Sequence, residues 1–153
     1  RELAVELLGA ERAERVCAEA LTLGVLEERG GKLELHPLAA AFLEERLRFA
    51  VGAGIPEERI CLDPGIGFGK TVEHNVALLR RLDEIATFGR PVLVGVSRKR
   101  FLGRLLGDPE VTTGSVAASV GAAVAAYTRG ATMLRVHDTR ETVEALAVAA
   151  AVL

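Results

Sequence analysis

The chain has 153 residues, enough for one domain with a real core, and 50% of them are apolar and 26% charged, as in ordinary globular proteins. The net charge of −2 gives no electrostatic reason to expect nucleic acid as a partner, and no apolar run is long enough to suggest a membrane span. Two cysteines are too few for a disulfide framework and no signal peptide is visible, so we expect a cytoplasmic protein in which Cys61 is buried in a strand.

The first 38 residues are predicted to form a segment of their own. Residues 1–23 have a largely helical pattern, and residues 25–35 are typical of two strands joined by a Gly30-Gly31 turn. A helix followed by such a hairpin is similar to the end of a winged-helix module, although no basic stripe accompanies it. A winged-helix-like segment and an unassigned helical hairpin both stay open here. Because the chain begins at Arg1 without Met, we expect a fragment or a processed product.

From residue 39 onward, predicted helices alternate with short apolar strands. The helices are expected at residues 39–52, 73–87, about 101–106, about 112–129 and 139–153, and the strands at 60–63, 91–96 and 131–136. The strand at 91–96 is continuously apolar, which favours cover on both faces. Predicted helix caps are Ser97, Thr112 or Thr113, and Asp138. This alternation predicts an α/β fold with a parallel sheet.

The end of the first strand carries the most informative stretch. Asp63 is followed at once by a loop with one proline, three glycines and the cation Lys70. Ligands of parallel α/β sheets bind at the carboxyl ends of the strands. A carboxylate can accept two hydrogen bonds from the amino and imino edge of a guanine-like or pterin ring. The loop therefore predicts a site for a flat, polar ligand.

The other two strand ends carry matching chemistry. Residues 97–100 place a hydroxyl and three cations at a helix start, where Ser97 suits a carboxylate or phosphate and Lys99 can donate to a ring carbonyl or nitrogen. Arg135 and His137 alternate along the third strand, so they point to one side and can clamp a diphosphate.

Each of these motifs also has a purely structural interpretation. The glycine loop can be a simple turn, the cationic run a solvated helix start, and a lone histidine a structural hydrogen-bonding group. Lys70 and Arg98 are the weaker site candidates, and we assign His36 and His74 to surface or cap positions. The sequence shows no Ser-His or Cys-His pairing. All three motifs fall at strand ends, and that combination favours a ligand site.

These residues carry a family resemblance over about residues 39–153, and residues 1–38 do not share it. The matching runs are DPGIGFGK at 63–70, GVSRKRF at 95–101 and RVHD at 135–138. In their order and spacing they resemble the last three strands of dihydropteroate synthase, an eight-stranded barrel enzyme of folate biosynthesis. The resemblance implies a partial (β/α)₈ TIM-type barrel. Methyltetrahydrofolate methyltransferases share the strand-end Asp but match the second and third runs less well.

The resemblance also implies a reaction and residue roles. Members of that family transfer a 7,8-dihydropterin-6-ylmethyl group from its diphosphate ester to 4-aminobenzoate, and the leaving diphosphate binds Mg²⁺. The roles implied here are pterin binding by Asp63 and Lys99, aminobenzoate binding by Phe68, Lys70 and Ser97, and diphosphate binding by Arg135 and His137. No residue of this chain is implied as a metal ligand, and none is implied as a nucleophile or general base, because the neutral amine attacks the methylene carbon as the diphosphate leaves. The implied partners are these small molecules and a second copy in a homodimer, with no nucleic acid and no membrane.

The chain departs from the family in extent. It lacks the Asn-x-Thr-Pro-Asp-Ser-Phe loop with which family members begin, and which supports the metal-bound diphosphate. A complete barrel of this type takes about 250 residues, and roughly 115 of the 153 are barrel-like here. Three interpretations stay open: a dihydropteroate synthase fragment or recombined product of uncertain activity, a non-catalytic pterin- or phosphate-binding module, and an interaction protein with a winged-helix remnant.

Overall fold

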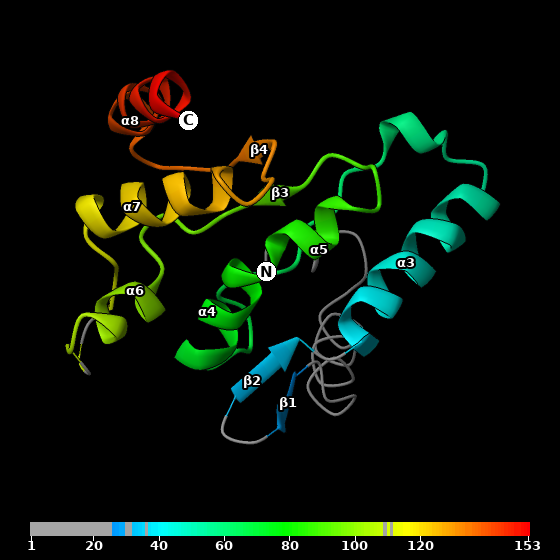
Figure 1. Cartoon of the computed structure of the whole chain (residues 1–153), viewed down its shortest axis with the longest axis horizontal. Helices are drawn as coiled ribbons and strands as arrows, with labels where there is room; N and C mark the ends of the chain where they lie inside the picture. The colour runs from blue at the N-terminus through cyan, green and yellow to red at the C-terminus, as the bar shows by residue number, and fades with distance from the viewer. Residues whose placement is uncertain (1–25, 30–31, 36, 109, 111) are drawn as a thin grey trace.

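The computed structural model describes residues 26–29, 32–35, 37–108, 110 and 112–153. The helix predicted over residues 1–23, the Gly30-Gly31 turn and His36 lie outside the described residues. The two strands of the predicted hairpin are confirmed: β1 (Leu26–Arg29) pairs antiparallel with β2 (Lys32–Leu35). β2 lies beside helix α4 (Val72–Arg80) in Figure 1. The division of the chain after residue 38 stays a prediction.

Three parallel segments form the small sheet that positions the site. β3 (Leu93–Val94) pairs in parallel with β4 (Met133–Leu134), and Leu62 forms a single parallel bridge to Val92. The ladders are shorter than the predicted strands. One reason is Pro64, which has no N–H with which the first ladder could continue. The described chain is therefore an α/β structure with little sheet, and the predicted parallel pairing is confirmed.

The core lies on one face of this sheet. Val92, Val94 and Val96 alternate along the second segment and are fully buried. The side chains packed around them are Leu62, Ile66, Leu78, Leu82, Ile85, Phe101, Leu102, Ala123, Ala126 and Ala131. The other face carries Cys61 and Met133, which are exposed and whose sulfur atoms lie 3.7 Å apart. The predicted burial of Cys61 is wrong, because successive strand residues face opposite sides and Cys61 points away from the helices.

In the described part of the chain, one α-helix precedes the parallel sheet segments, and further helices follow each of them. These helices are α3 (Pro37–Gly52), α4, α5 (Leu82–Ala86), α6 (Arg100–Leu105), α7 (Val116–Tyr127) and α8 (Thr139–Val152), with a 3₁₀ turn η1 (Glu57–Arg59) after α3. In Figure 1, α3 and η1 lie at one end of the molecule and α6, α7 and α8 at the other. None of the helices that the structure describes is long and apolar enough to cross a bilayer.

The single helix predicted over residues 73–87 is two helices. Arg81, with φ −115° and ψ 25°, separates α4 from α5. No proline or glycine marks this break, and the apolar stripe runs across it through Leu78, Leu82 and Ile85, which are all buried. The pattern of burial is therefore the same for one helix or two, and only the backbone distinguishes them.

Helix α7 begins later than predicted. Its cap is Ser115, whose Oγ accepts the backbone N–H of Ala118 at 3.1 Å, so the predicted cap at Thr112 or Thr113 is wrong. Gly114 explains the shift. A Cβ at that position would lie 2.9 Å from the Lys99 carbonyl oxygen, so the chain passes α6 in close contact before the helix can start.

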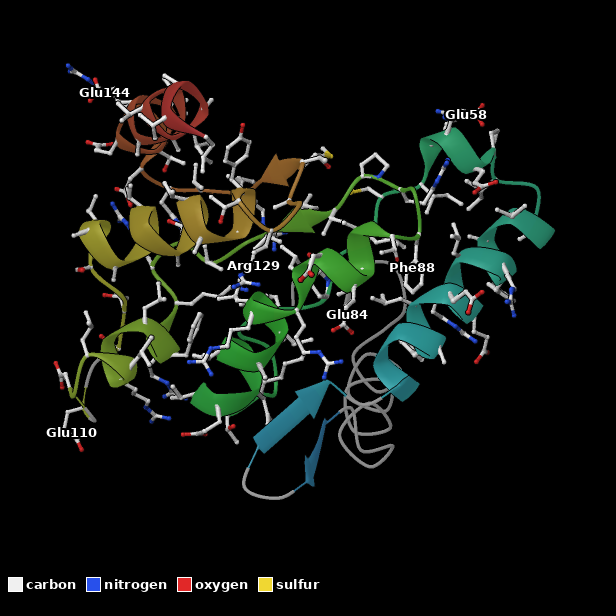
Figure 2. The ribbon with its side chains drawn as sticks, viewed as in Figure 1. Glu58, Glu84, Phe88, Glu110, Arg129 and Glu144 are labelled. Carbon is white, nitrogen blue, oxygen red and sulfur yellow. The ribbon has the colours of Figure 1, made fainter. Side chains whose placement is uncertain are left out.

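Arg129 joins the end of α7 to the end of α4, as Figure 2 shows. Its guanidinium donates to the carbonyl oxygen of Arg80, the last residue of α4, and lies 3.9 Å from the Asp83 carboxylate. A cation is favourable there because the last carbonyl groups of a helix have no partner within the helix. Phe88, after α5, packs on the edge of the core (Figure 2). The Arg129 contacts tie α4 and α5 to the segment between α7 and β4.

Candidate functional site

The loop after Leu62 begins with a turn made by Asp63. Its Oδ1 accepts the backbone N–H of Gly65 at 2.8 Å, and Gly65 has φ +69°, a conformation that favours glycine. The Lys70 ammonium closes the loop from the other side, donating to the carbonyl oxygens of Gly65 at 2.9 Å and Phe68 at 3.2 Å. The Asp63 carboxylate therefore stands at the strand end, with its Oδ2 turned toward Arg135, which follows β4.

Asn75, on α4, holds this loop through hydrogen bonds, a role that the sequence did not indicate. It is completely buried on α4, its Oδ1 accepts the backbone N–H of Gly67 at 2.6 Å, and its Nδ2 donates to the Thr71 carbonyl oxygen at 2.6 Å. Gly67 has φ +82°. Because both ends of the amide are paired, Asn75 is satisfied in an apolar setting and fixes where the loop turns. An asparagine on the first turns of a helix gives no sequence signal that separates this role from a solvent-facing one.

Lys99 reaches the same loop from the second strand end. Its ammonium donates to the Ile66 carbonyl oxygen and lies 4.2 Å from the centroid of the Phe68 ring. This placement over an aromatic face is a cation–π contact. Gly67 makes it possible, because a Cβ there would lie 2.2 Å from the Lys99 Cδ. The glycine loop and Lys99 therefore form one packed unit.

Burial lowers the pKa of Lys99 to about 8. Desolvation of the ammonium is the main cause, and the positive charges of Arg135 and Lys70 lower it further, while the Asp63 carboxylate opposes them. Lys99 therefore shares an electrostatic environment with Asp63 and Arg135, from the first and third strand ends. At neutral pH it remains a proton donor, held in a partly desolvated position.

Ser97 faces the loop after β4. Its side chain is 5% exposed, its Oγ accepts the backbone N–H of His137 at 3.1 Å, and it lies 3.0 Å from His137 Nδ1. The predicted cap of α6 by Ser97 is wrong, since the cap position is Lys99, without a side-chain bond. The expectation that the chain holds no Ser-His pair is wrong as well. Residues 40 apart meet here because β3 and β4 run in parallel.

Arg98 makes a second link between the same two loops. Its φ of +57° is in the left-handed region, and its backbone N–H donates to the Ser119 Oγ at 2.8 Å. Its guanidinium donates to both carboxylate oxygens of Asp138, at 3.1 and 2.6 Å, and these bonds hold the pKa of Asp138 below its usual range. Asp138 is the N-cap residue of α8, as predicted, but its side chain makes no cap hydrogen bond, because the carboxylate pairs with Arg98 instead.

The third strand end places its two predicted residues against different neighbours. The Arg135 guanidinium lies 4.0 Å from Asp63 Oδ2 and packs over Gly95, where a Cβ would lie 3.0 Å from Nη2. His137 contacts Ser97. The structure thus brings Asp63, Lys99 and Arg135 into one charged group and joins Ser97 to His137.

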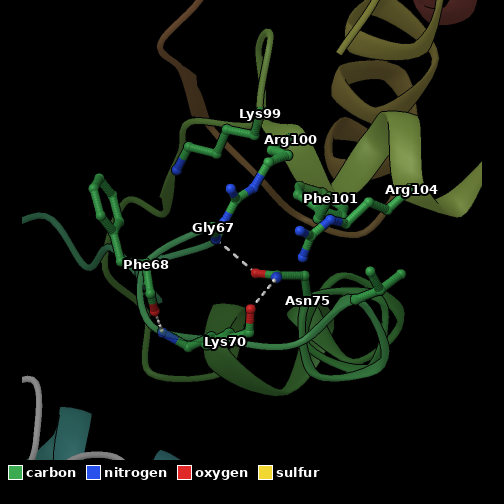
Figure 3. A pocket seen from close by; sticks show the side chains of 9 residues that line it. Gly67, Phe68, Lys70, Asn75, Lys99, Arg100, Phe101 and Arg104 are labelled. Atoms are coloured by element: carbon green, nitrogen blue, oxygen red, sulfur yellow. Dashed lines mark hydrogen bonds between the residues drawn. The ribbon is translucent and has the colours of Figure 1, made fainter. Parts of the chain in front are cut away.

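A pocket of about 280 Å³ opens between the glycine loop and α6 (Figure 3). Its lining residues are Gly67, Phe68, Lys70, Val72, Asn75, Lys99, Arg100, Phe101 and Arg104. Four of them are cations and none is a carboxylate, so the pocket suits an anionic group beside an apolar ring. Among the residues predicted for the site, it includes Phe68, Lys70 and Lys99. Arg104 is a pocket residue that the sequence motifs did not indicate.

Comparison with known proteins places this geometry in a family. The family model described as pterin binding enzyme matches residues 26–137, so it begins at β1 and includes residues 26–38, for which no resemblance was expected. Dihydropteroate synthase of Neisseria meningitidis serogroup C is 46% identical over 108 residues, which are 70% of this chain and 38% of that protein. Dihydropteroate synthase of Escherichia coli K12 is 50% identical over 103 residues, 66% of this chain and 35% of that protein.

Solved structures give the same result. Dihydropteroate synthase from Xanthomonas albilineans in complex with 7,8-dihydropteroate superposes with a TM-score of 0.70 and 48% identity, covering 74% of this chain and 43% of that chain. Dihydropteroate synthase from Thermus thermophilus in complex with 4-aminobenzoate superposes with a TM-score of 0.67 and 52% identity. The match covers 75% of this chain and 44% of that chain. The chain therefore spans well under half the length of the relatives it matches. It belongs to the family of pterin-binding enzymes.

Proposed function

We propose that the described chain is the part of a dihydropteroate synthase that carries the last three βα units of a (β/α)₈ barrel. Three features support this: the parallel order Leu62, β3, β4; the site residues at the strand ends; and the similarity to dihydropteroate synthases over about 70% of the chain. The proposed overall reaction joins 7,8-dihydropterin-6-ylmethyl diphosphate to 4-aminobenzoate. The bond between the methylene carbon and the diphosphate oxygen breaks, its electrons leave with the diphosphate, and the amine nitrogen bonds to carbon and releases a proton.

In this proposal Asp63 and Lys99 bind the pterin ring. The observation that carries it is the charged group at the strand ends, where Asp63 Oδ2 lies 4.0 Å from Arg135 and both residues act on the pKa of Lys99. The exposed carboxylate oxygens suit the amino and imino edge of the ring, and the Lys99 ammonium suits a ring carbonyl or nitrogen. Partial desolvation of this group would strengthen each of these contacts.

Arg135 and His137 are proposed to bind the diphosphate. Stabilising the charge that develops on a leaving group is an electrostatic task, which a guanidinium and an imidazole can perform without a nucleophile. The family association with Mg²⁺ belongs to the diphosphate in this proposal. The described residues contain no cluster of three or more His, Cys, Asp or Glu side chains that could hold a metal, and Arg and His donors do not suit Mg²⁺, so this part of the chain does not fit a protein-bound magnesium site.

Phe68, Lys70 and Ser97 are proposed to border the aminobenzoate. The cationic pocket beside Phe68 supports this for the first two, since an aromatic carboxylate needs an apolar face and a positive charge. Ser97 contacts His137, so in this proposal it borders the aminobenzoate next to the diphosphate.

Binding of 7,8-dihydropterin-6-ylmethyl diphosphate by calorimetry tests the proposal. We expect wild-type binding to weaken at least tenfold in Asp63→Asn and in Lys99→Ala, because each loses a charge-assisted contact. The matched control is Asp83→Asn, which neutralises an exposed carboxylate on α5 and should leave binding unchanged. Binding that is the same in Asp63→Asn and in the control would refute the ring-binding role.

Release of diphosphate that depends on 4-aminobenzoate tests turnover. Release would support the transferase. Binding without release at high protein concentration would instead support the non-catalytic pterin-binding module for this chain alone.

We also propose a cytoplasmic location and a homodimer. The exposed, unpaired thiol of Cys61 fits a reducing compartment. Exposed apolar side chains on α8, at Val143, Val148 and Val152, fit association with a second copy. Cell fractionation and sedimentation-equilibrium measurements test these two proposals, and a monomer at all accessible concentrations would overturn the dimer.

A further inference from the structure

Ser97 and Arg98, which follow β3, contact His137 and Asp138, which follow β4. The parallel register sets Val94 opposite Leu134, an offset of 40 residues. The same offset joins Ser97 to His137 and Arg98 to Asp138 through side chains. The links therefore continue the strand pairing beyond the last ladder bond and bring the His137 ring into a defined place.

The number of donor and acceptor sites on the Ser97 hydroxyl determines the direction of its hydrogen bond with the His137 ring. A serine hydroxyl has one proton and two acceptor sites. One acceptor site takes the His137 backbone N–H at 3.1 Å, and the ring Nδ1 lies at 3.0 Å. Within the described part of the chain, the structure gives the Ser97 proton no other acceptor, and the side chain is 5% exposed. If Nδ1 carried the proton, the hydroxyl proton would be buried without a partner, which is costly.

We propose that Ser97 is a positioning residue for His137. It donates its hydroxyl proton to Nδ1, accepts the backbone N–H of the same residue, and thereby holds the neutral imidazole as the tautomer with its proton on Nε2. That tautomer presents an N–H donor to an anion without requiring a charged ring. The consequence for ligand binding rests on the proposed diphosphate site, whereas the tautomer itself does not.

Arg98 and Ser119 keep Ser97 in this position. The left-handed φ of Arg98 is unusual for a residue with a side chain, and it persists because the Ser119 hydroxyl accepts the Arg98 N–H and Asp138 takes both guanidinium bonds. The turn lets three neighbouring residues face three ways: Ser97 to His137, Arg98 to Asp138, and Lys99 to the glycine loop. His137 is thus positioned by the turn after β3, and α7 holds that turn in place through Ser119.

A nucleophilic serine is the competing interpretation of the pair. Ser97 is nearly inaccessible, and the adjacent carboxylate of Asp138 is held by Arg98 instead of orienting the imidazole. Both observations favour positioning over nucleophilic attack.

Long-range ¹H–¹⁵N spectra of the histidine rings test the proposal on the whole chain at about pH 8.5, where an ordinary imidazole is neutral. In the wild type we expect His137 with a protonated Nε2 and an unprotonated Nδ1. In Ser97→Ala the two nitrogen shifts should move toward each other as both tautomers become populated, and Ser97→Thr should restore the wild-type pattern. Ser115→Ala, which removes a helix cap of similar energetic value, should leave the His137 shifts unchanged.

Inorganic diphosphate is the ligand probe in the same samples. We expect Ser97→Ala to weaken its binding about three- to tenfold, the value of one hydrogen bond. A wild-type chain that does not bind diphosphate would refute the proposed diphosphate site, while the ring spectra would still decide the tautomer. A protonated Nδ1 in the wild type, unchanged spectra in Ser97→Ala, or labelling of Ser97 by a fluorophosphonate would each overturn the positioning role.

Discussion

The substitution Lys99→Met separates the effect of the buried lysine on the free energy of unfolding from its effect on ligand binding. Burial lowers the pKa of this lysine from 10.5 to about 8. At about 1.4 kcal/mol per pH unit, that difference amounts to roughly 3 kcal/mol against the charged form. The ammonium is only partly buried and stays in contact with the Ile66 carbonyl oxygen, so solvent screening reduces the cost to about 1 kcal/mol. We expect Lys99→Met to be more stable than the wild type by about 1 kcal/mol at about pH 7, and to lose pterin binding.

The lowered pKa of Lys99 also determines whether the free energy of unfolding rises or falls with pH. In the unfolded chain Lys99 has its usual pKa of 10.5, so between about pH 8 and 10.5 unfolding takes up a proton. Wild-type stability therefore rises with pH across this window, and the advantage of Lys99→Met shrinks between about pH 7 and about pH 9.5. Urea unfolding followed by circular dichroism at both pH values measures it.

Arg104→Met is the matched control for this experiment. It removes another cation that lines the same pocket and leaves Lys99 in place. Its stability relative to the wild type should not acquire the dependence on pH that is due to Lys99. The reasoning is refuted if Lys99→Met is less stable than the wild type at about pH 7, or if its advantage is equal at the two pH values.

Three further substitutions test how the site is built, and urea unfolding measures each. Gly67→Ala should destabilise the fold by about 1–2 kcal/mol, because φ is +82° and the new Cβ would displace the Lys99 side chain; unchanged stability would contradict the packed unit. Asn75→Ala should cost about 2–3 kcal/mol, because the Gly67 N–H loses a buried acceptor; a loss below about 0.5 kcal/mol would show that the loop holds without it. Ser115→Ala should cost about 1 kcal/mol and Thr113→Ala almost nothing, because only Ser115 caps α7; the reverse order would restore the predicted cap.

Local pattern was sufficient for much of the fold. The β1–β2 hairpin, α3, α6, α7, α8 and the parallel order of the three strand segments follow from apolar periodicity and from proline and glycine positions. The break at Arg81 could not be predicted, because one helix and two bury the same leucines. Neither could the exposure of Cys61, which depends on which face of the sheet the helices cover.

The sequence by itself determined which residue types stand at the strand ends. Asp63, Ser97, Lys99, Arg135 and His137 follow short apolar segments, and that placement requires only the alternation of strands and helices.

The tertiary structure alone decided which of these residues meet. Ser97 contacts His137, and Arg98 contacts Asp138, because the β3–β4 register has an offset of 40 residues. A slip of one residue in that register would part both pairs and turn every side chain of the strand to the other face. Likewise, the lowered pKa of Lys99 comes from burial over the glycine loop, which no local pattern records. Pairing across the sheet is a long-range property, so it is fixed only when the chain is folded.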